Sequence, residues 1–331
     1  MRIEISKSTV EPMTSWLKRY KEQGVRDEDS LREILSMHDY GVEFQRYGEP
    51  NLPVCGISFE EAVDFFLHFD EKEFDNPRLA YKKEGFLAFY NDMEQRLEKA
   101  EMLDSITQED LKLVELLLEN GLPDSILESL GNFTVLLTVS IGNSMGWPYG
   151  EYIHFDIANM DFLGDKDTFL HVLAHEIHHI VFSQLIPEDM SARQYFFVNF
   201  ACEGLAVHFC NNAATPGKPS KYPGAAVGMD EQGWKFYEQQ HGELIAKVMA
   251  DAKKAEDLTM EQVAELVGEY EQFTFTSLKT GETRTVLQYP TYYIGCYLWG
   301  RIDMILGKER LFEVLASKDG FANAWEKVNR L

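Results

Sequence analysis

Cysteine and basic residues are scarce in this sequence of 331 residues. The cysteines form no C-x-x-C pair and are widely spaced, so a disulfide framework is not expected in a chain of this size. They are Cys55, Cys202, Cys210 and Cys296. Lysine and arginine total 31 against 55 acidic residues, which gives a net charge of −24. This charge disfavours nucleic-acid and membrane-surface roles. It indicates a soluble protein whose molecules repel one another or, alternatively, a preference for cationic substrates.

Long apolar segments and repeats are also missing. The first residues, MRIEISKSTVEPM, include no apolar stretch of the kind found in signal peptides. No run of 18 uninterrupted apolar residues occurs, which excludes an ordinary transmembrane helix. Solenoids and propellers are disfavoured because no repeat of fixed period is found. We therefore expect a cytoplasmic protein with reduced cysteines.

Helix signals dominate residues 1–130. The segment SFEE (58–61) forms a capping box before the apolar run AVDFFLHF. A second start signal, TQED (107–110), precedes LKLVELLL, which Gly121 and Pro123 end. No chemistry in this part of the chain is favoured over a packing role.

The pattern changes after residue 130. FTVLLTVSI (133–141) and EYIHFDIA (151–158) are typical of strands, and we expect the Gly-rich segment GNSMGWPYG to join them as a loop. No other convincing β segment is found, and helices follow, interrupted by a long loop at 212–233. The sequence predicts a mostly helical α+β protein with a helical N-terminal region, 1–130, and a catalytic region, 131–331.

Four of the nine histidines lie within HVLAHEIHH (171–179). His175, Glu176 and His179 satisfy the pattern H-E-x-x-H, which places two histidines on successive turns of one helical face, where they can bind one Zn²⁺. The glutamate then lies over the open position of the metal as a general base. The alternative is a metal-free helix with partly buried, hydrogen-bonded histidines.

The two other histidines of this stretch are expected to support the site. His178 lies about 60° around the helix from His175, so it cannot join the same tetrahedron and is expected to pack or to contact a ligand residue. His171 is one turn below His175, where it can line the pocket without binding the metal.

A third ligand must come from elsewhere, because no histidine follows His179 before His208. Glu203 is a lone carboxylate in the apolar segment FVNFACEGLAVHF, and burying it without a partner would cost several kcal/mol. A metal is the simplest partner. A salt bridge to an arginine, or the capping of another helix, is the alternative.

H-E-x-x-H followed on the next helix by a glutamate in E-G-L-A resembles the gluzincin metallopeptidases, and most nearly bacterial zinc-dependent peptidases known mainly as uncharacterised domains. The resemblance covers residues 131–305. It implies zinc bound by His175, His179 and Glu203, with Glu176 as general base.

The same resemblance implies further elements of the site. EYIHFDI would supply a cleft-lining strand whose exposed edge could pair with substrate. In YYIG (292–295), Tyr292 matches the tyrosine that stabilises the oxyanion, with Tyr293 as the alternative.

Two departures from the family pattern concern ligand orientation and specificity. Val207 replaces the aspartate that often orients a zinc-binding histidine in these enzymes, so that contact must come from another residue. The aminopeptidase signature Gly-x-Met-Glu-Asn is lacking, and GNSMG is only faintly similar to it. Glu151 is a candidate anchor for a substrate amine.

The prediction is a zinc-dependent peptidase that acts on peptides or proteins. Zinc would lower the pKa of its water towards about 7, and Glu176 would accept the proton. The alternatives are a zinc hydrolase of another amide or ester, and a non-catalytic binding protein that keeps the fold. The sequence determines neither the oligomeric state nor the choice between exo- and endopeptidase action.

Overall fold

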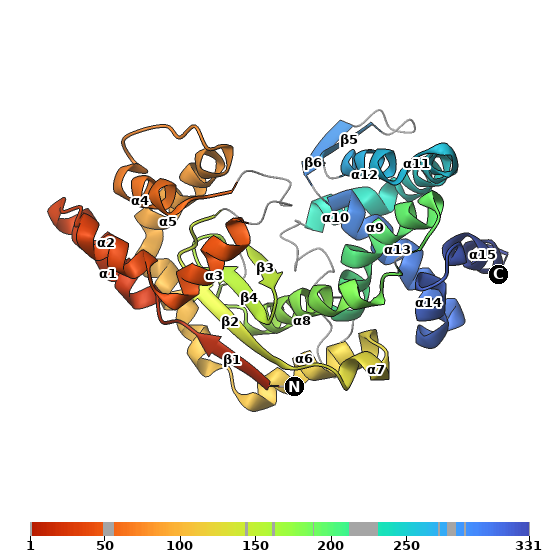
Figure 1. The fold of residues 1–331 in the computed structure, drawn as a ribbon, viewed down its shortest axis with the longest axis horizontal. Coiled ribbons are helices and arrows are strands. Elements are labelled where there is room, and N and C mark those ends of the chain that lie inside the picture. The colour runs from red at the N-terminus through yellow and green to blue at the C-terminus, as the bar shows by residue number, and fades with distance from the viewer. Residues whose placement is uncertain are drawn as a thin grey trace. The chain divides into compact units, whose positions relative to one another are not determined.

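The computed structural model describes residues 2–48, 56–142, 145–160, 163–187, 189–211, 231–270, 272–276, 283–287 and 289–330. Helices make up most of these residues, and the strands form a small sheet and a hairpin (Figure 1). The predicted mostly helical α+β class is therefore confirmed. No helix in the described ranges is both long and apolar enough to cross a membrane.

Contacts divide the chain into two compact units. The first comprises Met1–Thr107 and Gly131–Lys166, and the second comprises Gln108–Leu130 and Asp167–Leu331. The predicted division into 1–130 and 131–331 stays a prediction, because contacts do not show where a catalytic domain begins. The loop predicted at 212–233 falls almost entirely outside the described residues, as does Cys55.

The sheet of the first unit has the strand order β1-β2-β4-β3. Its strands are β1 (Arg2–Ser6), β2 (Asn132–Thr138), β3 (Gly146–Tyr149) and β4 (Tyr152–Asp156). Strands β1 and β4 both pair parallel to β2, and β3 pairs antiparallel to β4. The predicted strands at 133–141 and 151–158 thus become neighbours in one mixed sheet.

Three expectations about strands were wrong. Strand β1 lies in the region expected to be helical, where five residues of RIEIS were too short a signal. Strand β3 lies in the expected loop, and it is an edge strand, which is where Pro148 is tolerated. Because β3 covers β4, the segment EYIHFDI has no exposed edge for substrate to pair with.

Helices make up much of the rest of the first unit. They are α1 (Val10–Gln23), α2 (Glu28–Leu35), α3 (His38–Tyr47), α4 (Phe59–His68), α5 (Pro77–Ala100) and the 3-10 helix η1 (Glu101–Ser105). The predicted capping box begins α4, with the Ser58 hydroxyl accepting from the Glu61 N–H and the Glu61 carboxylate accepting from the Ser58 N–H. The core of the first unit includes buried phenylalanines of α4 and α5, among them Phe65, Phe66, Phe86 and Phe89.

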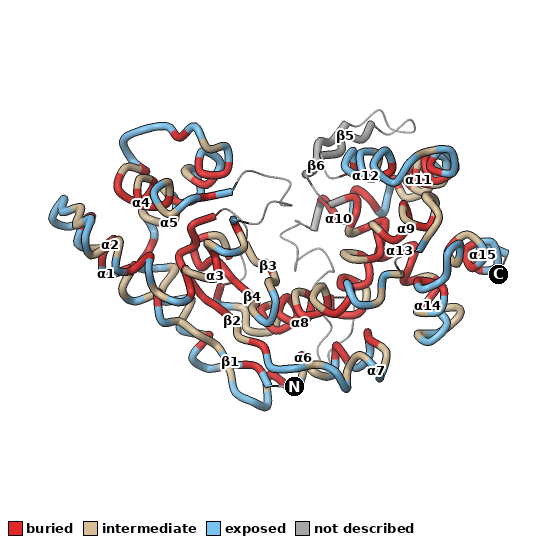
Figure 2. Tube along the Cα trace, in the orientation of Figure 1, coloured by how far each residue is buried: buried red, intermediate tan, exposed pale blue. Residues whose placement is uncertain are grey.

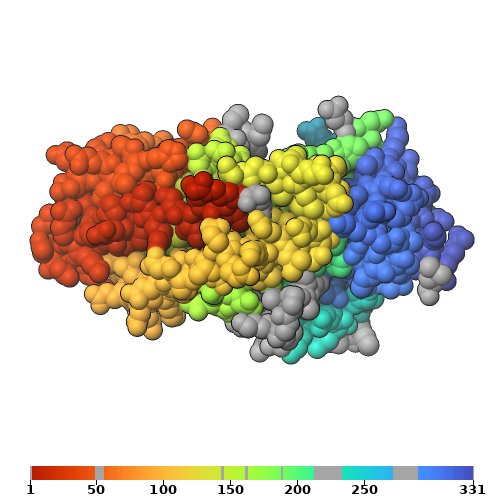
Figure 3. Space-filling view, turned by 90° about the horizontal axis from the view of Figure 1, so that it is seen from below, coloured from red at the N-terminus to blue at the C-terminus, as the bar shows by residue number. Residues whose placement is uncertain are grey.

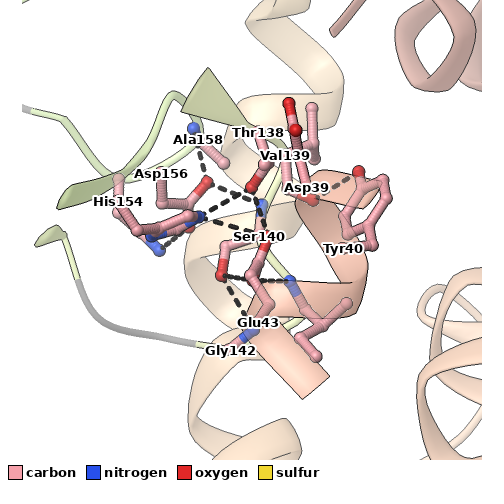
Figure 4. Close-up of polar contacts among 12 residues, drawn as sticks. Asp39, Tyr40, Glu43, Thr138, Val139, Ser140, Gly142, His154, Asp156 and Ala158 are labelled. Atoms are coloured by element: carbon pink, nitrogen blue, oxygen red, sulfur yellow. Dashed lines mark hydrogen bonds and ion pairs between the residues drawn. The ribbon is translucent and has the colours of Figure 1, made fainter. Parts of the chain in front are cut away.

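Charged residues are buried where β2 and β4 end (Figure 4). Glu43 of α3 is fully buried, accepts hydrogen bonds from Thr138 Oγ1 and Ser140 Oγ at 2.6 and 2.7 Å, and lies 3.2 Å from His154 Nε2. Asp156 accepts from the N–H groups of Ser140 and Ala158 (Figure 4). This network joins α3 to the strand ends.

Burial and neighbouring charges shift the pKa values of this network in opposite directions. Burial alone would raise the pKa of Glu43, but the charge of His154 and the hydrogen bonds from Thr138 and Ser140 lower it below 4.5. The pKa of Asp156 is raised by burial, against the charge of Lys82. Lys82 Nζ donates to the carbonyl oxygens of Ser140 and Gly142.

The second unit is helical apart from one hairpin. Its elements are α6 (Gln108–Gly121), α7 (Asp124–Leu127), α8 (Lys166–Phe182), η2 (Ser183–Leu185), α9 (Ala192–Ala206), the π-helix η3 (Val207–Asn211), α10 (Glu231–Gln239), α11 (His241–Lys254), η5 (Ala255–Asp257), α12 (Met260–Gly268), β5 (Gln272–Thr276), β6 (Thr283–Leu287), α13 (Tyr289–Leu306), α14 (Lys308–Leu315) and α15 (Gly320–Val328). The antiparallel pair β5–β6 corrects the expectation that the last third is entirely helical.

Burial differs strongly among these helices. Much of α8 and α9 is buried, as Figure 2 shows. Helix α7 has no buried residue, and side chains of α6 and α7 are visible in yellow in Figure 3. Helix α6 begins and ends as its sequence signals predict.

Helices α9 and α13 are in direct backbone contact. A Cβ on Gly204 would overlap the backbone of Gly295, and a Cβ on Gly295 would overlap the carbonyl oxygen of Phe200. Trp299 Nε1 donates to the Phe197 carbonyl at 2.9 Å across the same interface. Only glycine allows the two helix axes to approach this closely.

We expect Glu43→Gln to lower the free energy of unfolding by about 3 kcal/mol at neutral pH, because it leaves buried donors and His154 without their charged partner. The folded pKa of Glu43 lies below 4.5. Its charged form therefore contributes this stability in full above pH 4.5, and the contribution is lost as the pH falls below that value.

Urea unfolding of both proteins between pH 7 and pH 3 measures this difference. Glu22→Gln, at an exposed position of α1, serves as the control and should leave stability unchanged. A difference between wild type and Glu43→Gln that grows as the pH falls would contradict the assignment.

Candidate metal centre

Helices α8 and α9 bring three metal-binding side chains together. The Nε2 atoms of His175 and His179 lie 2.9 Å apart. Glu203 Oε2 lies 3.1 Å from each of them. Within the described residues, these three form the one group of histidine, cysteine and acidic side chains that could hold a metal ion. The carboxylate of Glu203 therefore has two histidines as partners, not an arginine.

The donor set fits zinc. Zinc–ligand bonds of about 2.0–2.1 Å at tetrahedral angles place two ligand atoms about 3.3 Å apart. The separations of 2.9–3.1 Å between these nitrogen and oxygen atoms are close to that value. Two histidines and one glutamate also leave one tetrahedral position open, which is the ligand count of hydrolytic zinc sites.

The other ring nitrogen of each histidine faces away from this centre. His175 Nδ1 lies 2.9 Å from Asn211 Oδ1, and His179 Nδ1 lies 3.3 Å from Cys202 Sγ. The amide oxygen of Asn211 can only accept, so it receives a hydrogen bond from a protonated Nδ1 of His175, and with a metal bound the lone pair of Nε2 would be the ligand. Nε2 of His175 faces His179 and Glu203, which is the orientation that a metal ligand requires.

Asn211 reaches His175 because the chain makes a π-turn at Val207–Asn211. In a regular α-helix, a residue eight positions after Glu203 lies about 80° away around the axis. A π-turn, with i→i+5 hydrogen bonds, rotates less per residue and reduces that offset. Glu203 and Asn211 therefore face the same helix, α8.

Charge and burial act together on the cluster. Burial alone would raise the pKa of Glu203, but the neighbouring His179 and His175 outweigh it and lower that pKa well below 4.5. Burial alone would lower the pKa of His179, but the charge of Glu203 raises it well above 6.5. Glu203 and His179 thus stabilise each other's charged forms.

The predicted catalytic residues border the cluster. Glu176 follows His175 in α8 and is partly buried. The ring centroid of Tyr292, in α13, lies 6.3 Å from that of His175 with the two ring planes at 30°. Tyr293 has other neighbours: its hydroxyl lies 3.1 Å from His241 Nδ1, and burial raises its pKa. Tyr292 is therefore the tyrosine near the predicted ligands.

The remaining sequence candidates are His171, His178 and Glu151. His171 is buried in α8, one turn before His175. His178 is fully buried and stacks on Phe182 and Phe209, and burial lowers its pKa to about 3, so its ring is neutral. Glu151 is exposed and belongs to the first unit, in the turn between β3 and β4. Its role as an amine anchor stays a prediction.

Two contacts of the cluster were not predicted. Cys202 precedes Glu203 directly, yet regular helical geometry gave no reason to pair it with His179. Regular helical geometry would place Asn211 on a different face from Glu203. The π-turn brings the two onto one face, and the segment VHFCN carries no recognised sequence signal for a π-turn. Val207, the position where related enzymes often have an aspartate, begins this turn.

Comparison with protein families places these residues in a known group. A family model described as "Putative zinc dependent peptidase (DUF5700)" matches residues 88–330, and the chain belongs to this family. No curated protein and no solved structure matches the sequence. His175, His179 and Glu203 lie inside the matched range.

We expect the protein, once stripped with a chelator, to gain thermal stability when zinc is added. At a zinc concentration 100 times the dissociation constant, binding to the folded state adds about 2.7 kcal/mol. His175→Ala and His179→Ala should abolish this gain, because each removes one of three ligands. Calorimetric melting with and without zinc measures it.

His38→Ala is the matched control, because this histidine is largely exposed and belongs to the first unit. It should keep the full zinc effect. An unchanged zinc effect in His179→Ala would rule out this cluster as the zinc site.

Proposed function

We propose that this protein is a gluzincin-type zinc peptidase in which His175, His179 and Glu203 bind the metal. The observation that supports this most is the convergence of two Nε2 atoms and one carboxylate oxygen at 2.9–3.1 Å, with both Nδ1 atoms contacted from outside the centre. Membership of a family described as zinc-dependent peptidases supports the same function.

When bound here, zinc supplies a Lewis acid that polarises a peptide carbonyl and lowers the pKa of water. Glu176 acts as the general base, accepting a proton from the attacking water and delivering it to the leaving nitrogen. Its place directly after His175 in α8 and its partial burial support this role.

Tyr292 is the donor that we assign to the oxyanion. Its ring is next to that of His175, and α13 is held against α9 by the glycine contact between Gly204 and Gly295. A phenol hydroxyl aimed at the developing negative charge stabilises the transition state by a few kcal/mol. The helix contact holds α13, which carries Tyr292, against α9.

Asn211 and Cys202 are positioning residues in this proposal. Each contacts the Nδ1 atom of one histidine ligand, which orients the ring and directs Nε2 to the metal. Together they take the place of the aspartate that Val207 replaces. The sulfur of Cys202 is a weaker acceptor than the amide oxygen of Asn211, so the larger contribution comes from Asn211.

Glu176→Gln should retain the zinc-dependent gain in stability and lose peptide hydrolysis at least about 100-fold, the usual contribution of a general base. Cleavage of a peptide library, followed by mass spectrometry, measures the rate. Glu309→Gln, at an exposed position of α14, should cleave at the wild-type rate. Wild-type cleavage by Glu176→Gln would show that this residue is not the base.

Asn211→Ala should weaken zinc binding about 10- to 100-fold, as the loss of a contact that orients a ligand commonly does. Asn211→Asp should restore it, because a carboxylate accepts the same hydrogen bond from His175 Nδ1. Competition with a zinc-binding dye measures the affinity without any assay of activity.

Asn323→Ala, at an exposed position of α15, is the control for this pair of variants. It should bind zinc as the wild type does. Equal zinc affinity in wild type and Asn211→Ala would assign Asn211 a packing role only.

A further inference from the structure

The second unit contains an open pocket of about 760 Å³ that none of the proposed zinc ligands lines. Its walls come from α6, the π-turn η3, α10 and α13. This volume is within the range of sites that bind small molecules. We infer that it is a second binding site, and that its ligand is a small organic cation such as a quaternary or primary amine.

Aromatic rings form one wall of the pocket. Trp234 and Tyr293 meet edge to face, with ring centroids 5.2 Å apart. Tyr297 belongs to the same wall, and its ring lies 4.0 Å from that of His241. His241 Nδ1 is also 3.1 Å from the Tyr293 hydroxyl, so it contacts both tyrosines from behind the wall. Rings held in this way form a preorganised surface for a cation.

The charges that line the pocket are acidic. Glu238 is exposed on α10 and has no ion pair among the described residues. Asp303 accepts a hydrogen bond from His208, whose Nε2 lies 2.9 Å away, so these two side chains satisfy each other. Among the residues that the structure describes, no lysine or arginine lines the pocket. After that pairing, the carboxylate of Glu238 remains to balance a positively charged ligand.

Glu238 lines the same pocket as the aromatic wall. Burial raises the pKa of Tyr293, and the charge of Glu238 raises it further. A cation bound between Tyr293 and Glu238 would be attracted both by the face of the aromatic ring and by the carboxylate. Among the described lining residues, an anion would meet two carboxylates and, of basic side chains, His208 alone. A neutral ligand would gain the apolar contact alone.

The absence of a side chain at Gly300 of α13 leaves space for His208. A Cβ on Gly300 would lie 2.6 Å from His208 Nδ1, so glycine is required for the imidazole to lie against α13 and reach Asp303. Helix α13 therefore presents Tyr292 to His175 and Tyr293 to the pocket. The pocket shares α13 and the π-turn with the candidate metal centre, but it uses no metal and does not rest on the proposed peptidase activity.

Calorimetric titration with choline, benzyltrimethylammonium and the uncharged choline analogue 3,3-dimethylbutan-1-ol tests the inference. All titrations contain a chelator, so that the metal centre takes no part. We expect at least one of the two cations to bind saturably at millimolar concentration or below, and the neutral analogue to bind at least about fivefold more weakly than choline. Glu238→Gln should weaken binding of the cation at least about fivefold.

Glu261→Gln removes the same charge at an exposed position of α12 outside the pocket, and it should bind the cation as the wild type does. Tyr297→Leu, which keeps an apolar side chain, should also weaken binding. No saturation by either cation up to about 10 mM would overturn the inference, given that weaker binding carries little specificity. Equal binding of choline and its neutral analogue, or unchanged binding in Glu238→Gln, would also overturn it.

Discussion

A carboxylate held between two imidazole rings is the interaction on which the second unit depends. Glu203 belongs to a helix whose other side chains are largely apolar, and its oxygen reaches His175 and His179 equally, at 3.1 Å. Desolvating a carboxylate is costly unless opposite charge compensates it. Helices α8 and α9 must therefore be held in one relative position, because a small shift would leave a charge without its partner.

Close helix contacts provide that constraint. Glycines at 204 and 295 allow the backbones of α9 and α13 to touch, and the π-turn after α9 turns Asn211 back toward His175. Both are local departures from ordinary helix packing, and both lie within two turns of Glu203. Irregular backbone geometry is enriched beside functional groups. A regular helix does not place a ligand and the residue that orients its neighbour on the same side.

The first unit also buries charged side chains, and hydrogen bonds and opposite charges compensate them. Glu43, His154, Asp156 and Lys82 are buried at the ends of β2 and β4, where backbone N–H and hydroxyl groups supply the hydrogen bonds that water would give. Each charged side chain there faces an opposite charge or a backbone dipole. The sheet is small, and this network fixes α3 and α5 to it more specifically than apolar packing alone would.

Helical geometry alone predicts that His175 and His179, four residues apart, lie on one face of a helix. The cost of burying a lone carboxylate pointed to Glu203 as their partner. The sequence therefore determined this group, and it also determined the mostly helical class. The sheet was predicted only in part, because β1 and β3 are short and gain their stability by pairing with strands far away in the chain. Only the tertiary structure decided that Asn211 and Cys202 contact the histidines and that β3 covers β4. Each of these depends on how separate segments approach one another, which local periodicity does not specify.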